Sequence, residues 1–154
     1  MTAMFRRVGE KIRAELSAED RALLTEIPEL LNDIGAKEND PAAAVLDRPA
    51  YRGDRDASAE FRELMESQIK RERFEDRSRF ASLLAVPEPM TDDEARGVLR
   101  VLNEARLALA ARSGAMDGGP GWELRISADK RLAVVAWLGF VESQLLAAMV
   151  PPDR

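Results

Sequence analysis

Asn103 and Arg106 are polar residues that could do chemistry, because they stand among apolar residues at helical spacing. A buried guanidinium needs a carboxylate partner, since an unpaired charge inside a protein is very costly. Glu142 is one candidate partner, and Glu60 and Glu63 are the others. We predict a buried polar network of Asn103, Arg106 and Glu142. A salt bridge that fixes helix register is favoured over an active site, and a small enzyme or ligand-binding protein that uses these Arg and carboxylate groups is an alternative.

The densest basic cluster is a second candidate site, and it consists of Lys70, Arg71, Arg73, Arg77 and Arg79. Such a cluster could bind an acidic protein or a nucleic acid. Interleaved acidic residues largely cancel its field, namely Glu66, Glu72, Glu75 and Asp76. A solvated helix face with internal ion pairs is therefore favoured. DNA binding by this charged helix is kept as an alternative function, with the candidate partner-binding residues Lys70, Arg71, Arg73 and Arg77.

The residue types that the chain lacks exclude several classes of site. There is no cysteine and no histidine, so disulfides, thiol switches and the Ser-His-Asp and Cys-His arrangements cannot form. Zinc sites are nearly excluded for the same reason. The carboxylates of Asp40, Asp47, Asp54 and Asp56 lack calcium-loop spacing, and the glycines of 118–121 lack the residues of a phosphate-binding loop. We expect no catalytic residues, no cofactor and no metal.

Composition predicts a mainly α-helical globular protein. Of the 154 residues, 45% are hydrophobic, 33% are charged and only 5% are aromatic, a mixture that favours helix over sheet. The length leaves room for a single domain over 1–154. A net charge of −5 argues against a broad nucleic-acid-binding face.

Apolar residues recur at helical spacing in the segments that must position these groups. The predicted helices cover about 18–34 (interrupted by Pro28), 58–85, 92–113 and 128–149. The strongest local signal is the capping box Thr91-Asp92-Asp93-Glu94, which starts the third helix. The helix over 58–85 has an expected buried stripe formed by Phe61, Leu64, Met65, Ile69, Phe74, Phe80, Leu83 and Leu84.

Short stretches at 11–16 and 122–126 alternate in polarity, and we expect them to pair, because lone strands are unstable. Residues 36–57 form an irregular loop with one short turn at 41–46. The expected fold is a helical bundle of about four main helices around a central C-terminal helix, with a small two-stranded β ribbon.

The last predicted helix is apolar almost all round between Leu132 and Val141. A helix without a polar face is either central in the core or half buried in a subunit interface, so we expect a homodimer. This run is shorter than the roughly 18–20 residues that span a bilayer. The charged N-terminal segment 1–16 does not resemble a secretory signal. We therefore expect a cytoplasmic protein without membrane contact.

Three groups of residues have a recognisable order and spacing, and Phe5-Arg6-Arg7 precedes them. They read DRPAYRGD with AEFREL over 47–54 and 59–64, LNEARLALAARSG over 102–114, and WLGFVESQLL over 137–146. Together they resemble an actinobacterial domain-of-unknown-function family associated with the oxidative-stress regulator AosR. The resemblance implies a cytoplasmic stress regulator that works with a sigma factor or RNA polymerase. Regulation in that family is linked to cysteine-based redox sensing, which a chain without cysteine cannot use.

The expected function is a non-catalytic regulatory or protein-interaction domain. The lack of catalytic residue types and the family resemblance both favour it. A transcriptional stress regulator acting through a sigma factor or RNA polymerase is its most specific form, and the expected partners are that protein and a second copy of the chain.

Overall fold

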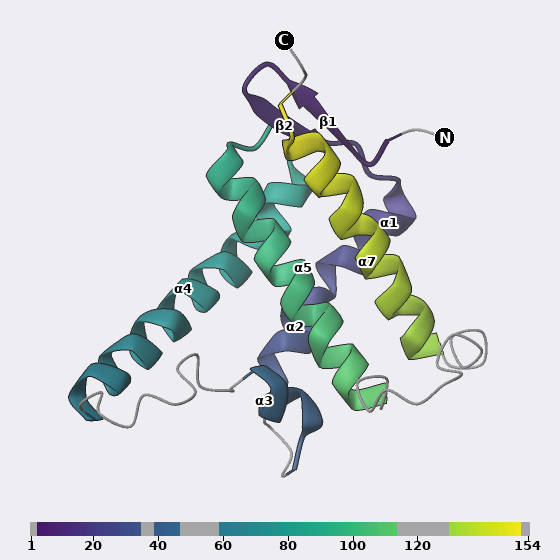
Figure 1. Cartoon of the computed structure of the whole chain (residues 1–154). Helices are drawn as coiled ribbons and strands as arrows, with labels where there is room; N and C mark the ends of the chain where they lie inside the picture. The colour runs from purple at the N-terminus through teal and green to yellow at the C-terminus, as the bar shows by residue number, and fades with distance from the viewer. Residues whose placement is uncertain (1–2, 35–38, 47–58, 114–129, 152–154) are drawn as a thin grey trace.

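The computed structural model describes residues 3–34, 39–46, 59–113 and 130–151 (Figure 1). It is mainly helical, with one two-stranded antiparallel sheet, as the sequence predicts. The strand predicted at 122–126 and most of the loop predicted at 36–57 lie outside the described residues.

The small sheet is a hairpin of β1 (Phe5–Val8) and β2 (Lys11–Ala14). Gly9 opens its two-residue loop with φ +64°, a backbone angle that glycine adopts without steric cost. The second edge of β2 is also occupied, because Ile12 and Met90 exchange backbone hydrogen bonds of 2.8 and 2.6 Å. The sequence analysis did not predict β1 as a partner of β2, and the predicted partner 122–126 lies outside the described residues.

Two short helices follow the hairpin, α1 (Ala18–Thr25) and α2 (Ile27–Asn32). The Ser17 side chain caps α1 by accepting a hydrogen bond from the backbone N–H of Asp20 at 3.1 Å. Pro28 lies in the first turn of α2, where its missing N–H costs nothing. The predicted interruption at Pro28 is thus a break between two helices.

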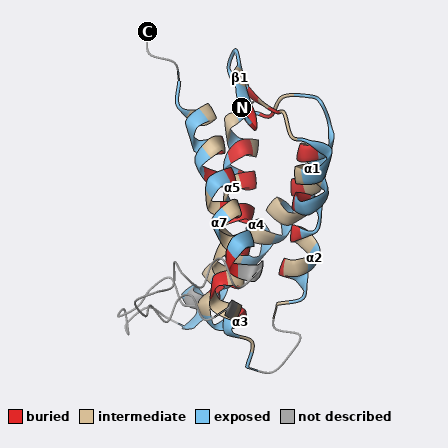
Figure 2. Cartoon of the chain, turned by 90° about the vertical axis from the view of Figure 1, so that its right-hand side faces the viewer, coloured by how far each residue is buried: buried red, intermediate tan, exposed pale blue. Residues whose placement is uncertain are grey.

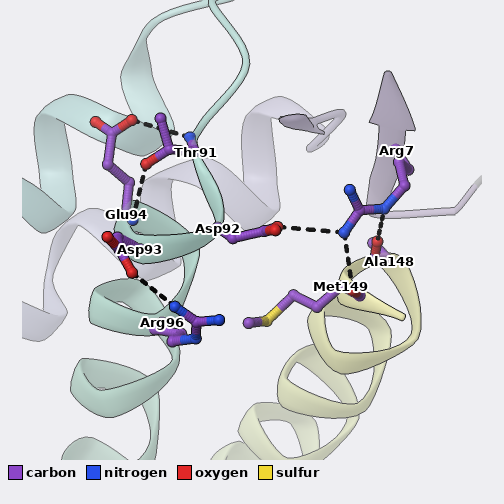
Figure 3. Close-up of polar contacts among 8 residues, drawn as sticks. All are labelled: Arg7, Thr91, Asp92, Asp93, Glu94, Arg96, Ala148 and Met149. Carbon is purple, nitrogen blue, oxygen red and sulfur yellow. Dashed lines mark hydrogen bonds and ion pairs between the residues drawn. The ribbon is translucent and has the colours of Figure 1, made fainter. Parts of the chain in front are cut away.

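The predicted turn at 41–46 is the helix α3 (Pro41–Leu46). Three long helices complete the described part of the chain, α4 (Ala59–Ala85), α5 (Asp92–Ser113) and α7 (Lys130–Met149). The capping box at the start of α5 is formed in both directions, by a hydrogen bond from Thr91 N to Glu94 Oε1 at 2.9 Å and one from Glu94 N to Thr91 Oγ1 at 3.1 Å (Figure 3).

Within the bundle, α5 packs against α7, α3, α4 and α2, and α7 packs along α5 and against β1 (Figure 1). Buried residues line the inner sides of these elements (Figure 2), and the largest fully buried side chains include Phe80, Leu84, Leu102, Leu138 and Leu145. The C-terminal helix thus packs against the bundle, while α5 contacts the largest number of neighbours.

Helix α4 extends away from the other helices toward its N-terminal end (Figure 1). Its 27 residues make a helix about 40 Å long, and its fully buried side chains Phe80 and Leu84 lie near the C-terminal end. The stripe predicted over the whole helix is therefore wrong in its first half, where Leu64 is exposed. Phe74 is 70% exposed, because it lies about 120° around the helix from Phe80.

Candidate functional site

The predicted network of Asn103, Arg106 and Glu142 forms where α5 packs on α7. Arg106 Nη2 donates a hydrogen bond to Asn103 Oδ1 at 2.8 Å, and Arg106 Nε lies 3.1 Å from Glu142 Oε2. The structure brings these three side chains together. Glu142, 8% exposed, is the buried charged residue of the described part of the chain, while the Arg106 side chain remains partly exposed.

The Arg106–Glu142 pair is an attraction between charges with incomplete hydrogen bonding. Neither Arg106 Nε nor Glu142 Oε1 has a hydrogen-bond partner among the described residues. Burial raises the pKa of Glu142 above its ordinary value, and the nearby charge of Arg106 offsets part of this effect. Neither residue lines either of the two grooves described below. The Arg106–Glu142 pair connects α5 to α7.

The basic cluster of α4 is divided between the bundle and the solvent. Arg77 donates two hydrogen bonds to Glu104 Oε2 of α5, at 2.8 and 3.1 Å, and Arg73 lies 3.5 Å from Glu104 Oε1. Lys70 and Arg71 are exposed. The partner-binding role of the cluster stays a prediction, but the Arg73 and Arg77 side chains already bind a carboxylate of their own chain.

Further ion pairs connect α5 to its neighbours. Arg100 binds Asp76 of α4 at 2.9 and 3.2 Å. Arg112 binds Asp40 at 3.2 and 2.8 Å, while Asp40 also caps α3 by accepting a hydrogen bond from Ala42 N at 3.0 Å. Asp40 thus has a structural role.

The polar groove between α4 and α5 has a volume of about 540 Å³ and a largely charged lining, including Glu72, Asp76, Arg79, Asp93 and Arg100. Its carboxylates are mixed with guanidinium groups, and Asp76 is bound to Arg100. Among the described residues, no cluster of acidic side chains could hold a metal ion. The loop residues Asp47, Asp54 and Asp56 and the glycines of 118–121 lie outside the described residues.

A second groove, of about 790 Å³, separates α1 and α2 from α7, and we call it the α2–α7 groove. Its apolar lining consists of Leu23, Ile27, Leu30, Leu109, Ala133, Val134, Trp137 and Leu138. Its charged lining consists of Glu26, Glu29 and Asp33, all exposed. Sequence reasoning missed this groove. The signal was the recurrence of acidic residues every three or four positions beside the apolar residues of α2.

Between Leu132 and Met149, the outer face of α7 is exposed and uncharged. Along one side of the helix, Ala136, Phe140, Ser143 and Ala147 are all exposed, and Phe140 is 46% exposed. Glu142, which points into the bundle, is the only charged residue of 132–149. The sequence left open a core or an interface position for this helix, and the exposed apolar side favours an interface.

By length and composition alone, Leu132–Met149 also qualifies as a membrane span, although 28% of its residues are buried within the protein. The longest apolar run of the sequence had suggested that no segment was long enough. A single helix of this kind is weak evidence for a membrane span, because a core helix of a soluble protein passes the same test.

Comparison with known proteins places the chain in a family. No curated protein and no solved structure matches it. The model of a family described as a domain of unknown function, DUF2017, matches residues 1–149. The chain therefore belongs to the DUF2017 family.

Proposed function

We propose that this protein is a non-catalytic interaction domain that forms a homodimer through the outer face of α7. The observation that carries the proposal is the uncharged, apolar and exposed side of that helix, centred on Phe140. Exposed apolar surface of this kind is costly in water and is typical of interaction sites.

A second copy of the chain is the occupant favoured by charge. The chain carries a net charge of −5, so two copies repel each other unless they meet through an uncharged surface. In an isologous dimer the same patch meets itself, and the outer face of α7 brings no like charges together.

The proposed role is regulation of transcription under stress, in the cytoplasm, by binding a sigma factor or RNA polymerase. Its support is the resemblance of segments 47–54, 59–64, 102–114 and 137–146 to the actinobacterial family associated with AosR. Such a role here has to operate through binding alone, because a chain without cysteine cannot use a thiol switch.

The two alternative functions receive less support from the contacts. DNA binding by α4 would need free cationic side chains, whereas Arg73 and Arg77 bind Glu104. An enzyme built on Arg106 and Glu142 would need an open pocket, and neither residue lines the two grooves described above.

The dimer is tested by light scattering coupled to size exclusion across micromolar concentrations. We expect wild-type protein to have twice the mass of one chain and Phe140→Glu to have the mass of one chain. Phe74→Glu, an equal change on the exposed surface of α4, is the matched control and should remain dimeric. A wild-type monomer over the whole range would remove the dimer from the proposal.

The regulatory role is tested by affinity purification of tagged wild-type protein from its native cytosol. Recovery of a sigma factor or a polymerase subunit, reproduced with the two purified proteins, would support it. A double variant with Lys70→Glu and Arg71→Glu tests whether the exposed end of the basic cluster contributes to binding the sigma factor or polymerase. Purified sigma factor and polymerase that both fail to bind would contradict the regulatory role.

A further inference from the structure

We infer that the α2–α7 groove binds a basic amphipathic helix of a partner protein. This inference rests on the proposed interaction function and adds to it the chemistry of a partner and the place where it binds. The groove and the proposed dimer face are different surfaces, because the groove is lined by Val134 and Leu138 whereas the dimer face is centred on Phe140.

The apolar part of the groove has the composition that suits the apolar side of a helix. Leu23 of α1 is 50% exposed and Val134 of α7 is 38% exposed, while Ile27 and Leu138 are buried beneath them. The half-buried Trp137 contributes an aromatic surface. A volume of about 790 Å³ accommodates several apolar side chains, as a helix presents them at positions i, i+3, i+4 and i+7.

The charged part of the groove is acidic. Glu26, Glu29 and Asp33 recur at intervals of three and four residues, which places them along one side of α2. Among the described residues, no cationic group lies within 4 Å of their carboxylates. Their charges are thus available to a cationic partner.

Among the described side chains, Arg112 faces this acidic side from a neighbouring helix. Arg112 of α5 lies close enough to Asp33 for that carboxylate to contribute to the raised pKa of Arg112, after the larger effect of Asp40. Arg112 already makes two hydrogen bonds to Asp40. It therefore weakens the field of Asp33 and leaves Glu26 and Glu29 as the principal anionic groups.

Charge complementarity selects the occupant among the alternatives. A second copy that met this groove with its own groove would place carboxylates against carboxylates. An uncharged apolar ligand would bring no counter-charge to the acidic side. A helix with apolar residues on one side and Lys or Arg along its flank matches both the lining and the charge.

The test uses fluorescence of Trp137 in a Trp122→Phe background, in which Trp137 is the single tryptophan because the chain has two. The probe is an 18-residue peptide designed as an amphipathic helix, with Leu on one side and Lys elsewhere. A second peptide has Glu in place of each Lys, and a third has the basic composition in scrambled order. We expect the basic helical peptide alone to shift the emission of Trp137, and its affinity to fall as salt rises.

Variants locate the binding. A triple variant with Glu26→Gln, Glu29→Gln and Asp33→Asn should have an affinity for the basic peptide about tenfold lower than the wild type. The matched control removes three exposed charges from α4 by Glu63→Gln, Glu66→Gln and Glu75→Gln. Its affinity for the peptide should stay within about twofold of the wild type. Val134→Asp should abolish the emission shift. Equal binding of the acidic peptide, or equal losses in the two triple variants, would overturn the inference. If the protein still forms its dimer and still binds its partner but does not bind the peptide, the inference about the α2–α7 groove is refuted and the proposed function is not.

Discussion

The Arg7 guanidinium on β1 lies 3.2 Å from the carboxylate of Asp92 in the first turn of α5 (Figure 3). The same guanidinium donates hydrogen bonds to the backbone carbonyls of Ala148 at 3.1 Å and Met149 at 2.8 Å, at the end of α7. Helix α7 has no basic residue in its own last turn. Arg7 therefore supplies the cation that the end of a helix favours, and it ties three elements together.

Replacing Arg7 by Ala should lower the free energy of unfolding by about 2–3 kcal/mol. The loss is large because the side chain is mostly buried and the carbonyls it leaves would lose charge-assisted hydrogen bonds. Arg7→Lys should retain less than half of this stabilisation, since a single ammonium cannot reproduce the forked geometry of the guanidinium. Urea denaturation measures the effect. Arg96→Ala, which removes an exposed ion pair with Asp93, is the control and should cost less than about 0.5 kcal/mol. Equal losses would contradict the role of Arg7.

Local signals made most of the helical fold predictable. Thr91 and Glu94 formed the expected capping box because both partners are near in sequence and need no tertiary contact. Pro28 correctly marked a break, since proline fixes its own φ angle wherever the chain goes. The ends of α4 and α5 were predicted to within about one residue, because helix start and stop signals are also local in sequence.

Long-range relationships were harder to predict. Segment 5–8 carries two arginines between Phe5 and Val8 and lacks strict alternation, so its strand and its pairing with β2 were missed. The network of Arg106 and Glu142 was found because a guanidinium among apolar residues requires a carboxylate. The α2–α7 groove was missed, because a groove depends on how helices diverge and not on any one helix.

Gly97 allows α4 to approach α5 closely, because a Cβ atom at this position would lie 3.0 Å from Asp76 Oδ1. Alanine in a helix interior is ordinarily more stable than glycine by about 1 kcal/mol. We expect Gly97→Ala to give no such gain in the wild-type protein, since Asp76 is held by Arg100 and cannot move freely. In a background that carries Asp76→Ala, Gly97→Ala should raise the free energy of unfolding by about 1 kcal/mol.

A double-mutant cycle of Gly97→Ala and Asp76→Ala, read by chemical denaturation, measures this coupling. Ala108→Gly, at a fully buried position further along α5, is an additivity control and should combine with Asp76→Ala without coupling. Additive effects of Gly97→Ala and Asp76→Ala would show that the carboxylate does not restrict position 97.

Glu104 holds two arginines of α4 and should be important for packing. Glu104→Gln should lower the free energy of unfolding by about 2 kcal/mol, because it leaves Arg73 and Arg77 partly buried without a carboxylate. Lys70→Gln, which changes an exposed cation of the same cluster, should cost less than about 0.5 kcal/mol. Thermal and urea unfolding measure both. Near-equal stability of Glu104→Gln and the wild type would mean that Arg73 and Arg77 are available to a partner.

Glu142 should make stability depend on pH above its ordinary pKa of 4.5. Burial raises its pKa in the folded protein, and Arg106 offsets only part of the rise. Between the unfolded and the folded pKa, the folded protein binds more protons than the unfolded chain. The contribution of Glu142 to stability is therefore fully present below pH 4.5 and is lost as the pH rises through the folded pKa.

The Gln side chain of Glu142→Gln cannot ionise, so the stability of the wild type minus that of this variant should fall as the pH rises above 4.5. Arg106→Met should steepen the fall in the presence of Glu142, because the offsetting cation is gone. Glu88→Gln, at an exposed position, corrects for the change in net charge. The measurement is urea denaturation at a series of pH values. A difference that rises with pH would mean that Arg106 outweighs burial and that the pKa of Glu142 is lowered in the folded protein.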